Sequence, residues 1–282
     1  MESLEAEIDR ARDLDVAALA DAIESIGFEC TRCGACCKAV EGCGDADDDA
    51  GNADTGDNNA RDDDASAGEA HDHVATVFPD EVRRLQRAAA ESESEDGSDT
   101  EAAGAGSGTE PYDWRDVARP MPYGLTEGPD GPEGETFEWA LQTDDCGDCR
   151  FYAEADEGEG NGGADGDTTG TATGRCTVHA DRPLVCRTYP FSVALGGTSQ
   201  PMGEAVDGEG MVRAHECEGL GRDISRADAE ELAAALKERA VRELEEAIAV
   251  RDTYEPVATE AGEVVVHDSE GAKRPDGSPV ER

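Results

Sequence analysis

Several stretches of the sequence repeat apolar residues at the spacing of an α-helix. Residues 1–27 carry two short apolar stripes, and Asp15 is placed to cap the second of the helices that they predict. Residues 79–89 begin with a proline and then place apolar residues on one face. The longest stripe runs over residues 225–251, where Ser225 can cap the helix. The pattern therefore predicts helices at both ends of the chain and one between them.

Two other stretches have the character of strands. Residues 74–78 form a short one before the proline, and residues 135–143, "ETFEWALQT", place Phe137, Trp139 and Leu141 on the same side. Because these strands are short and the helices long, the pattern predicts an α+β fold that is mainly helical with short strands.

Polar segments interrupt these elements at about 41–73, 91–110 and 154–174. Their Asp, Glu, Gly and Ser content is typical of low-complexity insertions, so we expect disordered loops there. After residue 255 the chain is polar apart from a short run of valines. The sequence thus predicts a single domain over residues 1–255, interrupted by acidic disordered insertions, and a polar C-terminal tail over residues 256–282.

The composition points to a small core and an unusual surface. Only 37% of the residues are hydrophobic and 4% aromatic, and the net charge is −44. Such a surface repels nucleic acid and anionic membranes, so we expect neither as a partner. The lysines are few, namely Lys38, Lys237 and Lys273. An acidic, lysine-poor surface suits a halophilic protein in molar salt, where self-repulsion is screened to about 3 Å.

The cysteines and the start of the chain bear on its compartment. The first residues are charged and lack the apolar region of a signal peptide, and no apolar run approaches the length of a membrane span. We therefore expect a cytoplasmic protein. In a reducing compartment the ten cysteines are poor candidates for disulfides and good candidates for metal ligands.

The candidate chemistry begins in "FECTRCGACCKAV", residues 28–40, which contains Cys30, Cys33, Cys36 and Cys37. The C-x2-C-x2-C spacing of the first three can hold three corners of a [4Fe–4S] iron–sulfur cluster, with a further ligand from far along the chain. The same spacing can supply part of a tetrahedral Zn2+ site. Adjacent side chains do not easily turn to one point, so Cys37 is expected to serve a second site or to lie behind the first.

Single cysteines further along can complete these sites: Cys149, Cys176, Cys186 and Cys217. Arg150, Arg175 and Arg187 flank three of them, and a guanidinium beside bound thiolates would offset their negative charge. Together these thiols suffice for up to two all-thiolate clusters. We therefore expect a small, irregular, metal-stapled domain.

At this point the sequence resembles the CxxCxxCC cysteine-cluster family. The resemblance rests on "FECTRCGACCKAV", "VFPDEVRRL", "CRFY", "CTVHADRPLVCRTYPF" and "CEGLG". Members of that family are described as zinc- or iron-chelating proteins and often as Fe–S-cluster-containing. By position, the resemblance implies these metal ligands: Cys30, Cys33, Cys36, Cys37, Cys149, Cys176, Cys186 and Cys217. Cys43 and Cys146 look additional, and His179 stands where the family tolerates His or Tyr.

Three classes of function are compatible with these residues. The first is a cytosolic metal-binding protein, with an iron–sulfur cluster serving electron transfer, metal handling or cluster-dependent assembly. The second is a protein-modifying enzyme, because bacterial flagellin lysine methylases resemble this family in their cysteine-cluster portion; no catalytic constellation stands out from the acidic background. The third is a zinc-stapled interaction module, in which the metal only holds the fold. The protein partner is unknown for each of them.

Overall fold

The computed structural model describes residues 3–39, 74–95, 113–129, 131–154, 174–196, 204–206 and 210–280. The expected insertions lie mostly outside these ranges. The helices, including the 3-10 helices η1 and η2, are α1 (Leu4–Asp13), α2 (Val16–Ile26), η1 (Ala35–Cys37), α3 (Pro79–Glu95), α4 (Trp114–Val117), η2 (His179–Asp181), α5 (Leu184–Thr188) and α6 (Arg226–Thr253). The strands are β1 (Thr76–Val77), β2 (Ala118–Pro120), β3 (Thr126–Gly128), β4 (Gly131–Thr136), β5 (Trp139–Leu141), β6 (Tyr152–Glu154), β7 (Gly174–Cys176), β8 (Phe191–Val193), β9 (Glu204–Ala205), β10 (Val212–Ala214), β11 (Val264–Asp268) and β12 (Gly271–Lys273).

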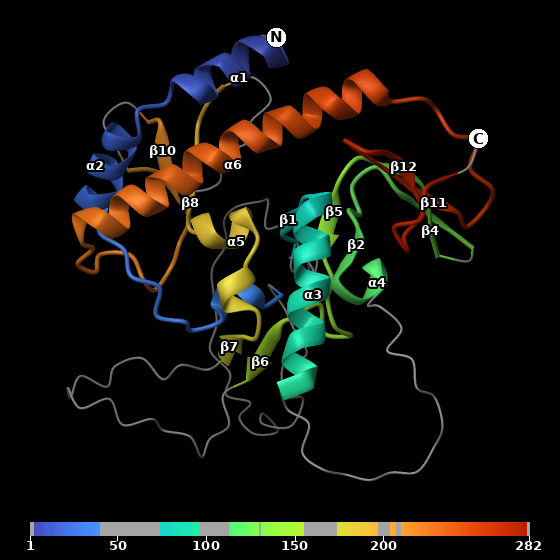
Figure 1. The fold of residues 1–282 in the computed structure, drawn as a ribbon, viewed down its shortest axis with the longest axis horizontal. Helices are drawn as coiled ribbons and strands as arrows, with labels where there is room; N and C mark the ends of the chain where they lie inside the picture. Colours follow the sequence, from blue (N-terminus) through green and yellow to red (C-terminus); the bar gives the residue numbers. More distant parts are fainter. Residues whose placement is uncertain are drawn as a thin grey trace, which may run out of the picture.

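One half of the molecule is helical, with α1 and α2 lying along α6 (Figure 1). The predicted caps are present: the Asp15 carboxylate accepts a hydrogen bond from the Ala17 N–H at 2.9 Å, and the Ser225 hydroxyl accepts one from the Asp228 N–H at 3.1 Å. The small antiparallel sheet β8–β10–β9 completes this half. Its core, which we call the first core, is lined by the predicted apolar faces of the helices, among them Ile8, Leu19, Ile23 and Leu236, and by Phe191 of β8.

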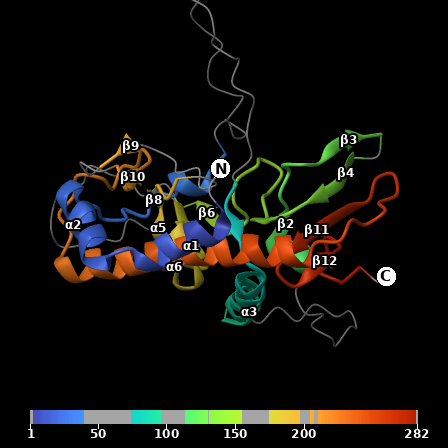
Figure 2. The same cartoon turned by 90° about the horizontal axis from the view of Figure 1, so that it is seen from above.

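The other half is built around the antiparallel sheet β1–β5–β2. Trp139 of β5 is almost completely buried, and its ring meets that of Trp114 edge-on, with 4.9 Å between the ring centroids. The second core includes Val77, Val82, Leu85, Val117 and Leu141. α6 joins the two halves, because it contacts α1 and α2 and also β11 (Figure 2). No helix within the described ranges is both long and apolar enough to cross a membrane.

A four-stranded sheet in the order β12–β11–β4–β3 lies at the end of the second half. β11 runs parallel to β4, and its Val265 and Val266 are fully buried. Part of the range 256–282, which reads as a polar tail in the sequence, therefore belongs to a sheet. The predicted strand over 135–143 is divided, since β4 ends before Phe137 and β5 begins after it. Phe137 is consequently 45% exposed and does not share the buried side of Trp139.

These observations correct the expected fold class. Of the described residues, helices hold 40% and strands 23%, in several small sheets, so the chain has a mixed α+β fold and is not mainly helical. The error arose because short strands of two or three residues leave little periodicity to detect. The expectation of a metal-stapled domain is also not supported: apolar cores and backbone pairing account for how the described segments meet.

A buried polar network ties α3, β5 and the β11–β12 hairpin together. The Asp268 carboxylate accepts hydrogen bonds from the Trp139 indole N–H at 2.9 Å and from the Lys273 ammonium at 2.7 Å. Lys273 also pairs with Glu270 at 2.7 Å, and Glu270 in turn pairs with Arg83 of α3. Lys273 is 6% exposed, which is unusual for a lysine. The network explains why one of the few lysines lies in the interior.

We expect the thermal stability of the chain to depend strongly on salt. A net charge of −44 repels itself, and the screening length falls from about 10 Å at 0.1 M salt to about 3 Å at 1 M. Raising KCl over that range should therefore increase Tm by about 5–10 °C. Melting curves followed by far-UV circular dichroism in a KCl series check this. An unchanged Tm would show that the acidity is not an adaptation to salt.

Candidate functional site

The first cysteines follow directly on α2, in a loop that is paired with the segment around Cys217. Gly27 ends α2 with φ +75°, and a Cβ there would lie 2.3 Å from the carbonyl oxygen of Arg222. The Glu29 N–H donates to the Gly219 carbonyl at 3.0 Å, and the Gly221 N–H donates to the Gly27 carbonyl at 3.0 Å. This backbone pairing brings Cys30 next to Cys217, which is far along the chain.

The cysteine doublet lies in η1 and is bonded to another segment. The Cys149 N–H donates to the Cys37 carbonyl at 2.7 Å, and the Ala39 N–H donates to the Asp148 carboxylate at 2.7 Å. η1 follows Gly34, which has φ +78° and lies against the Tyr152 ring; a Cβ on Gly34 would come within 2.4 Å of that ring. The close approach requires glycine and holds the doublet beside the Cys149 loop.

Cys176 and Cys186 reach the same region from β7 and α5. Cys176 is the register partner of Tyr152 in the β6–β7 hairpin. Cys186 lies on α5, whose first N–H, that of Leu184, donates at 2.9 Å to the buried carboxylate of Glu81. A buried carboxylate on α3 therefore positions the short helix that carries the thiol, and sequence reasoning had overlooked it among so many acidic residues.

The eight predicted ligands fall into two sets that differ in their surroundings. The inner set packs against the second core: Cys37, Cys149, Cys176 and Cys186. The outer set lies on the loop after α2 and on the segment paired with it, and Cys30 and Cys36 are exposed: Cys30, Cys33, Cys36 and Cys217. None of the eight is in a disulfide bond. The doublet contributes one cysteine to each set, and a hydrogen bond joins its two thiols. That Cys37 serves a second metal site stays a prediction.

Within the outer set, the surroundings of Cys36 favour its thiolate form. A hydrogen bond from the Cys37 thiol lowers the pKa of Cys36 from 9.0 to about 7, and the positive charge of Arg182 acts in the same direction. Burial raises the pKa of Cys217, and the charges of the Cys33, Cys36 and Cys30 thiolates raise it further. Cys217 is thus an electrostatic neighbour of all three cysteines of the C-x2-C-x2-C motif.

The inner set stays protonated at neutral pH. Burial raises the pKa of Cys149 to about 12, and the charges of Cys176 and Cys36 add to the effect. Burial also raises the pKa of Cys186 and of Cys176. A soft cation that binds these thiols must displace their protons, so its binding would be linked to proton release.

The arginine that acts on the thiols differs from those that the sequence suggested. Arg150, Arg175 and Arg187, which flank cysteines in sequence, are exposed. The guanidinium whose charge lowers the pKa of Cys36, and opposes the rise at Cys176 and Cys186, belongs to Arg182. In the sequence, Arg182 stands four residues before Cys186, and no motif there marks it as a neighbour of the thiols.

The thiols are neighbours, but their side chains do not form a closed ligand group. Within the described ranges, no three His, Cys, Asp or Glu side chains are arranged so as to hold a metal ion. Cys146 stands apart from both sets because it is disulfide-bonded, although the sequence made the cysteines poor candidates for disulfides. Cys43 lies outside the described residues. Thiolate sulfur is a suitable donor for a soft metal. In the described part of the chain, however, the side chains are not arranged around one.

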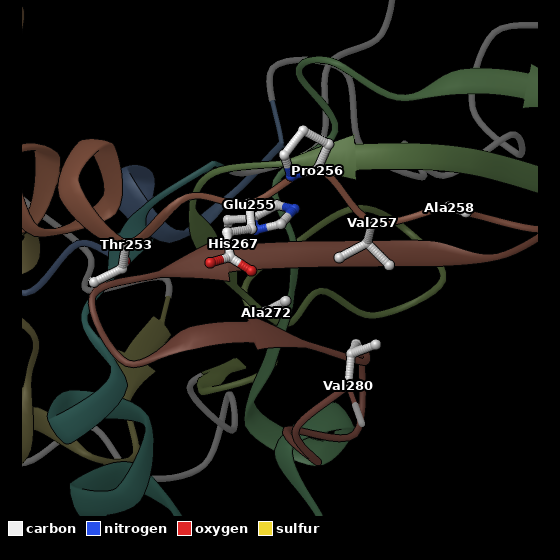
Figure 3. Close-up of a pocket in the computed structure, with 8 residues that line it drawn as sticks. All are labelled: Thr253, Glu255, Pro256, Val257, Ala258, His267, Ala272 and Val280. Atoms are coloured by element: carbon white, nitrogen blue, oxygen red, sulfur yellow. The ribbon is translucent and has the colours of Figure 1, made fainter. Parts of the chain in front are cut away.

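A pocket of about 220 Å3 lies far from the thiols, beside β11 and the segment after α6 (Figure 3). Thr253, Glu255, Val257 and His267 are among its lining residues. The His267 ring pairs with Glu135 at 2.9 Å, and the same carboxylate accepts hydrogen bonds from the Tyr254 hydroxyl and the Val257 N–H. These contacts fasten the segment after α6 to β4, which is a structural role.

Comparison with known proteins yields no match: no family model, no curated protein and no solved structure is similar to this chain. The resemblance to the cysteine-cluster family therefore stays a prediction that rests on the motifs themselves. Any function has to be argued from the thiols and their surroundings.

Proposed function

We propose that this chain is a metal-binding protein that carries an iron–sulfur cluster on its cysteine thiolates, as the cysteine-cluster motifs imply. The observation that carries the proposal is that eight cysteines outside any disulfide bond come from separate segments that pair or pack against one another. Thiolate sulfur is the ligand of iron–sulfur clusters and of many zinc sites. A cytoplasmic location and a role in electron transfer, metal handling or cluster assembly belong to the same proposal.

Each set offers enough sulfur for a site of its own. In the outer set the C-x2-C-x2-C loop would supply three ligands and Cys217 the remaining one, which is the far ligand that the spacing demands. In the inner set the ligands would be Cys37, Cys149, Cys176 and Cys186. A cluster held there would supply one-electron chemistry, and its potential would respond to burial and nearby charge.

The protein residues around the thiols have distinct parts to play. Arg182 brings positive charge to Cys36, so it would stabilise the thiolate form that binds metal. The inner set is the more buried, since Cys149 is buried and its other cysteines are partly buried against the apolar core, while Cys30 and Cys36 of the outer set are exposed. An inner site would therefore hold its metal in a drier environment, and an outer site would be open to exchange with a partner.

Anaerobic purification followed by iron, zinc and acid-labile sulfide analysis tests the proposal. We expect coloured protein with broad visible absorbance and with iron and sulfide in comparable amounts. Colourless protein that contains zinc without sulfide would overturn the iron–sulfur proposal in favour of a zinc site. Protein without any bound metal, prepared with reduced thiols, would overturn metal binding altogether.

A further inference from the structure

The pocket beside β11 combines a small volume, apolar walls and one carboxylate (Figure 3). Its volume of about 220 Å3 lies below the range of about 300–1,000 Å3 that is typical of pockets for drug-sized ligands. Five of its eight lining residues are apolar, and Glu255 is the one acidic residue among the eight. Lysine and arginine carry a cationic head on an apolar stem, so a single side chain of this kind suits both the size and the chemistry of the pocket.

Two exposed aromatic rings border the pocket. Tyr254 is flanked in the chain by two lining residues, and its ring meets that of His267, a third lining residue, with 4.8 Å between the ring centroids. The Phe137 ring stacks on the same imidazole at 5.6 Å and meets the Tyr254 ring at 5.5 Å. Phe137 is 45% exposed and Tyr254 37%. The rim of the pocket therefore presents contiguous apolar surface to solvent, which is typical of interaction sites.

The contacts of Glu135 hold this rim in place. Its carboxylate accepts hydrogen bonds from the Tyr254 hydroxyl at 3.2 Å and from the Val257 N–H at 3.1 Å, and it pairs with the His267 ring at 2.9 Å. A partner that binds here therefore meets rings that are already ordered, so binding carries little further loss of side-chain entropy. Rigid aromatic residues beside a pocket are characteristic of the energetic hot spots of protein interfaces.

Cations of the chain itself cover three other aromatic rings, but not those of the rim. The Arg242 guanidinium, for example, lies 4.4 Å from the centroid of the Phe78 ring. Among the described residues, no lysine or arginine lies over Phe137 or Tyr254. A cation over an aromatic face is attracted by the ring, and the rim leaves this contact to another molecule.

We propose that the pocket and its aromatic rim form a docking site for a partner protein, which inserts one lysine or arginine as its anchor. The apolar stem would lie against the pocket walls, and the cationic head would pair with the Glu255 carboxylate beside the Tyr254 ring. The net charge of −44 favours a partner with a basic surface, since opposite charges increase the rate of encounter. The inference does not depend on the metal-binding proposal, because the pocket lies far from the thiols.

NMR titration of the full chain with a short peptide that carries one arginine between two leucines tests the site. The solution contains 1 M KCl, where nonspecific attraction is screened within about 3 Å. The backbone signals of Val257 and His267 should shift and saturate. A lysine peptide shows which cation the pocket prefers, and either preference supports the site. A citrulline peptide, which has a neutral group of the same shape, should cause no saturable shift.

Variants of the pocket give the second part of the test. Glu255→Gln should weaken binding of the arginine peptide about 3–5-fold, which corresponds to a partly exposed ion pair. Ala272→Leu should abolish saturable binding, because the larger side chain fills the pocket. The matched control is Glu231→Gln, which changes an exposed glutamate of α6 that does not line the pocket and should bind like the wild type. Circular dichroism confirms that each variant is folded.

Several results would overturn the proposal. They are the absence of saturable shifts, equal binding of the citrulline peptide, unchanged binding by folded Ala272→Leu, and equal weakening by Glu231→Gln, which would indicate nonspecific attraction. If butylguanidine alone bound as tightly as the arginine peptide, the site would take a small organic cation and the docking proposal would fail. Shifts of the same signals at increasing protein concentration without peptide would assign the surface to a second copy of the chain and would also overturn it.

Discussion

We expect Cys149→Ser to lose about half of the bound metal, because it removes a ligand of the inner set and leaves the outer set complete. Cys217→Ser should lose the other half for the converse reason, and the double variant should bind none. Serine keeps the size of the side chain but replaces the soft thiolate by a hydroxyl, which is a poor ligand for iron or zinc. Metal-to-protein ratios measured on anaerobically purified variants check the prediction.

The control for these variants is Cys146→Ser, which changes a cysteine that belongs to neither set. It should retain the full metal content, with circular dichroism confirming that the chain is folded. If either single variant lost all metal, the two sets would have to form one shared site. If Cys146→Ser lost metal while Cys217→Ser kept it, the ligand assignment would be wrong.

The second large effect is expected from Lys273→Met. The Lys273 ammonium and the Asp268 carboxylate are 8% and 1% exposed and lie 2.7 Å apart. Removing the cation leaves a buried carboxylate without its main partner, which costs about 3–5 kcal/mol of unfolding free energy. Urea unfolding in molar KCl measures this, since urea leaves the ionic strength unchanged.

Lys237→Met is the matched control, because the Lys237 ammonium donates to the Leu14 carbonyl at 2.7 Å and does not neutralise a buried carboxylate. Its substitution should cost less than about 2 kcal/mol. Adding Asp268→Asn to Lys273→Met should recover part of the loss, since the neutral amide does not need a cation. Equal effects of the two lysine substitutions would contradict the network as described.

The helices were predictable from the sequence because their signals are local. The stripe over 225–251 and its Ser225 cap reappear in α6, and Asp15 caps α2 as expected. Periodicity and capping depend on residues three or four apart, so no tertiary information is needed. The strands were less predictable, since β11 pairs with β4 across about half of the chain and neither stretch alternates clearly.

The same difference between local and long-range information applies to the candidate site. By itself the sequence determined which thiols are candidates, because C-x2-C-x2-C and the adjacent Cys37 are local patterns. Only the tertiary structure decided that Cys217 joins the outer set, that Cys149 joins the inner one, and that Arg182 supplies the nearby charge. These relations depend on backbone pairing and packing between segments far apart in the chain, and no pattern within a single segment specifies which distant segment it will contact.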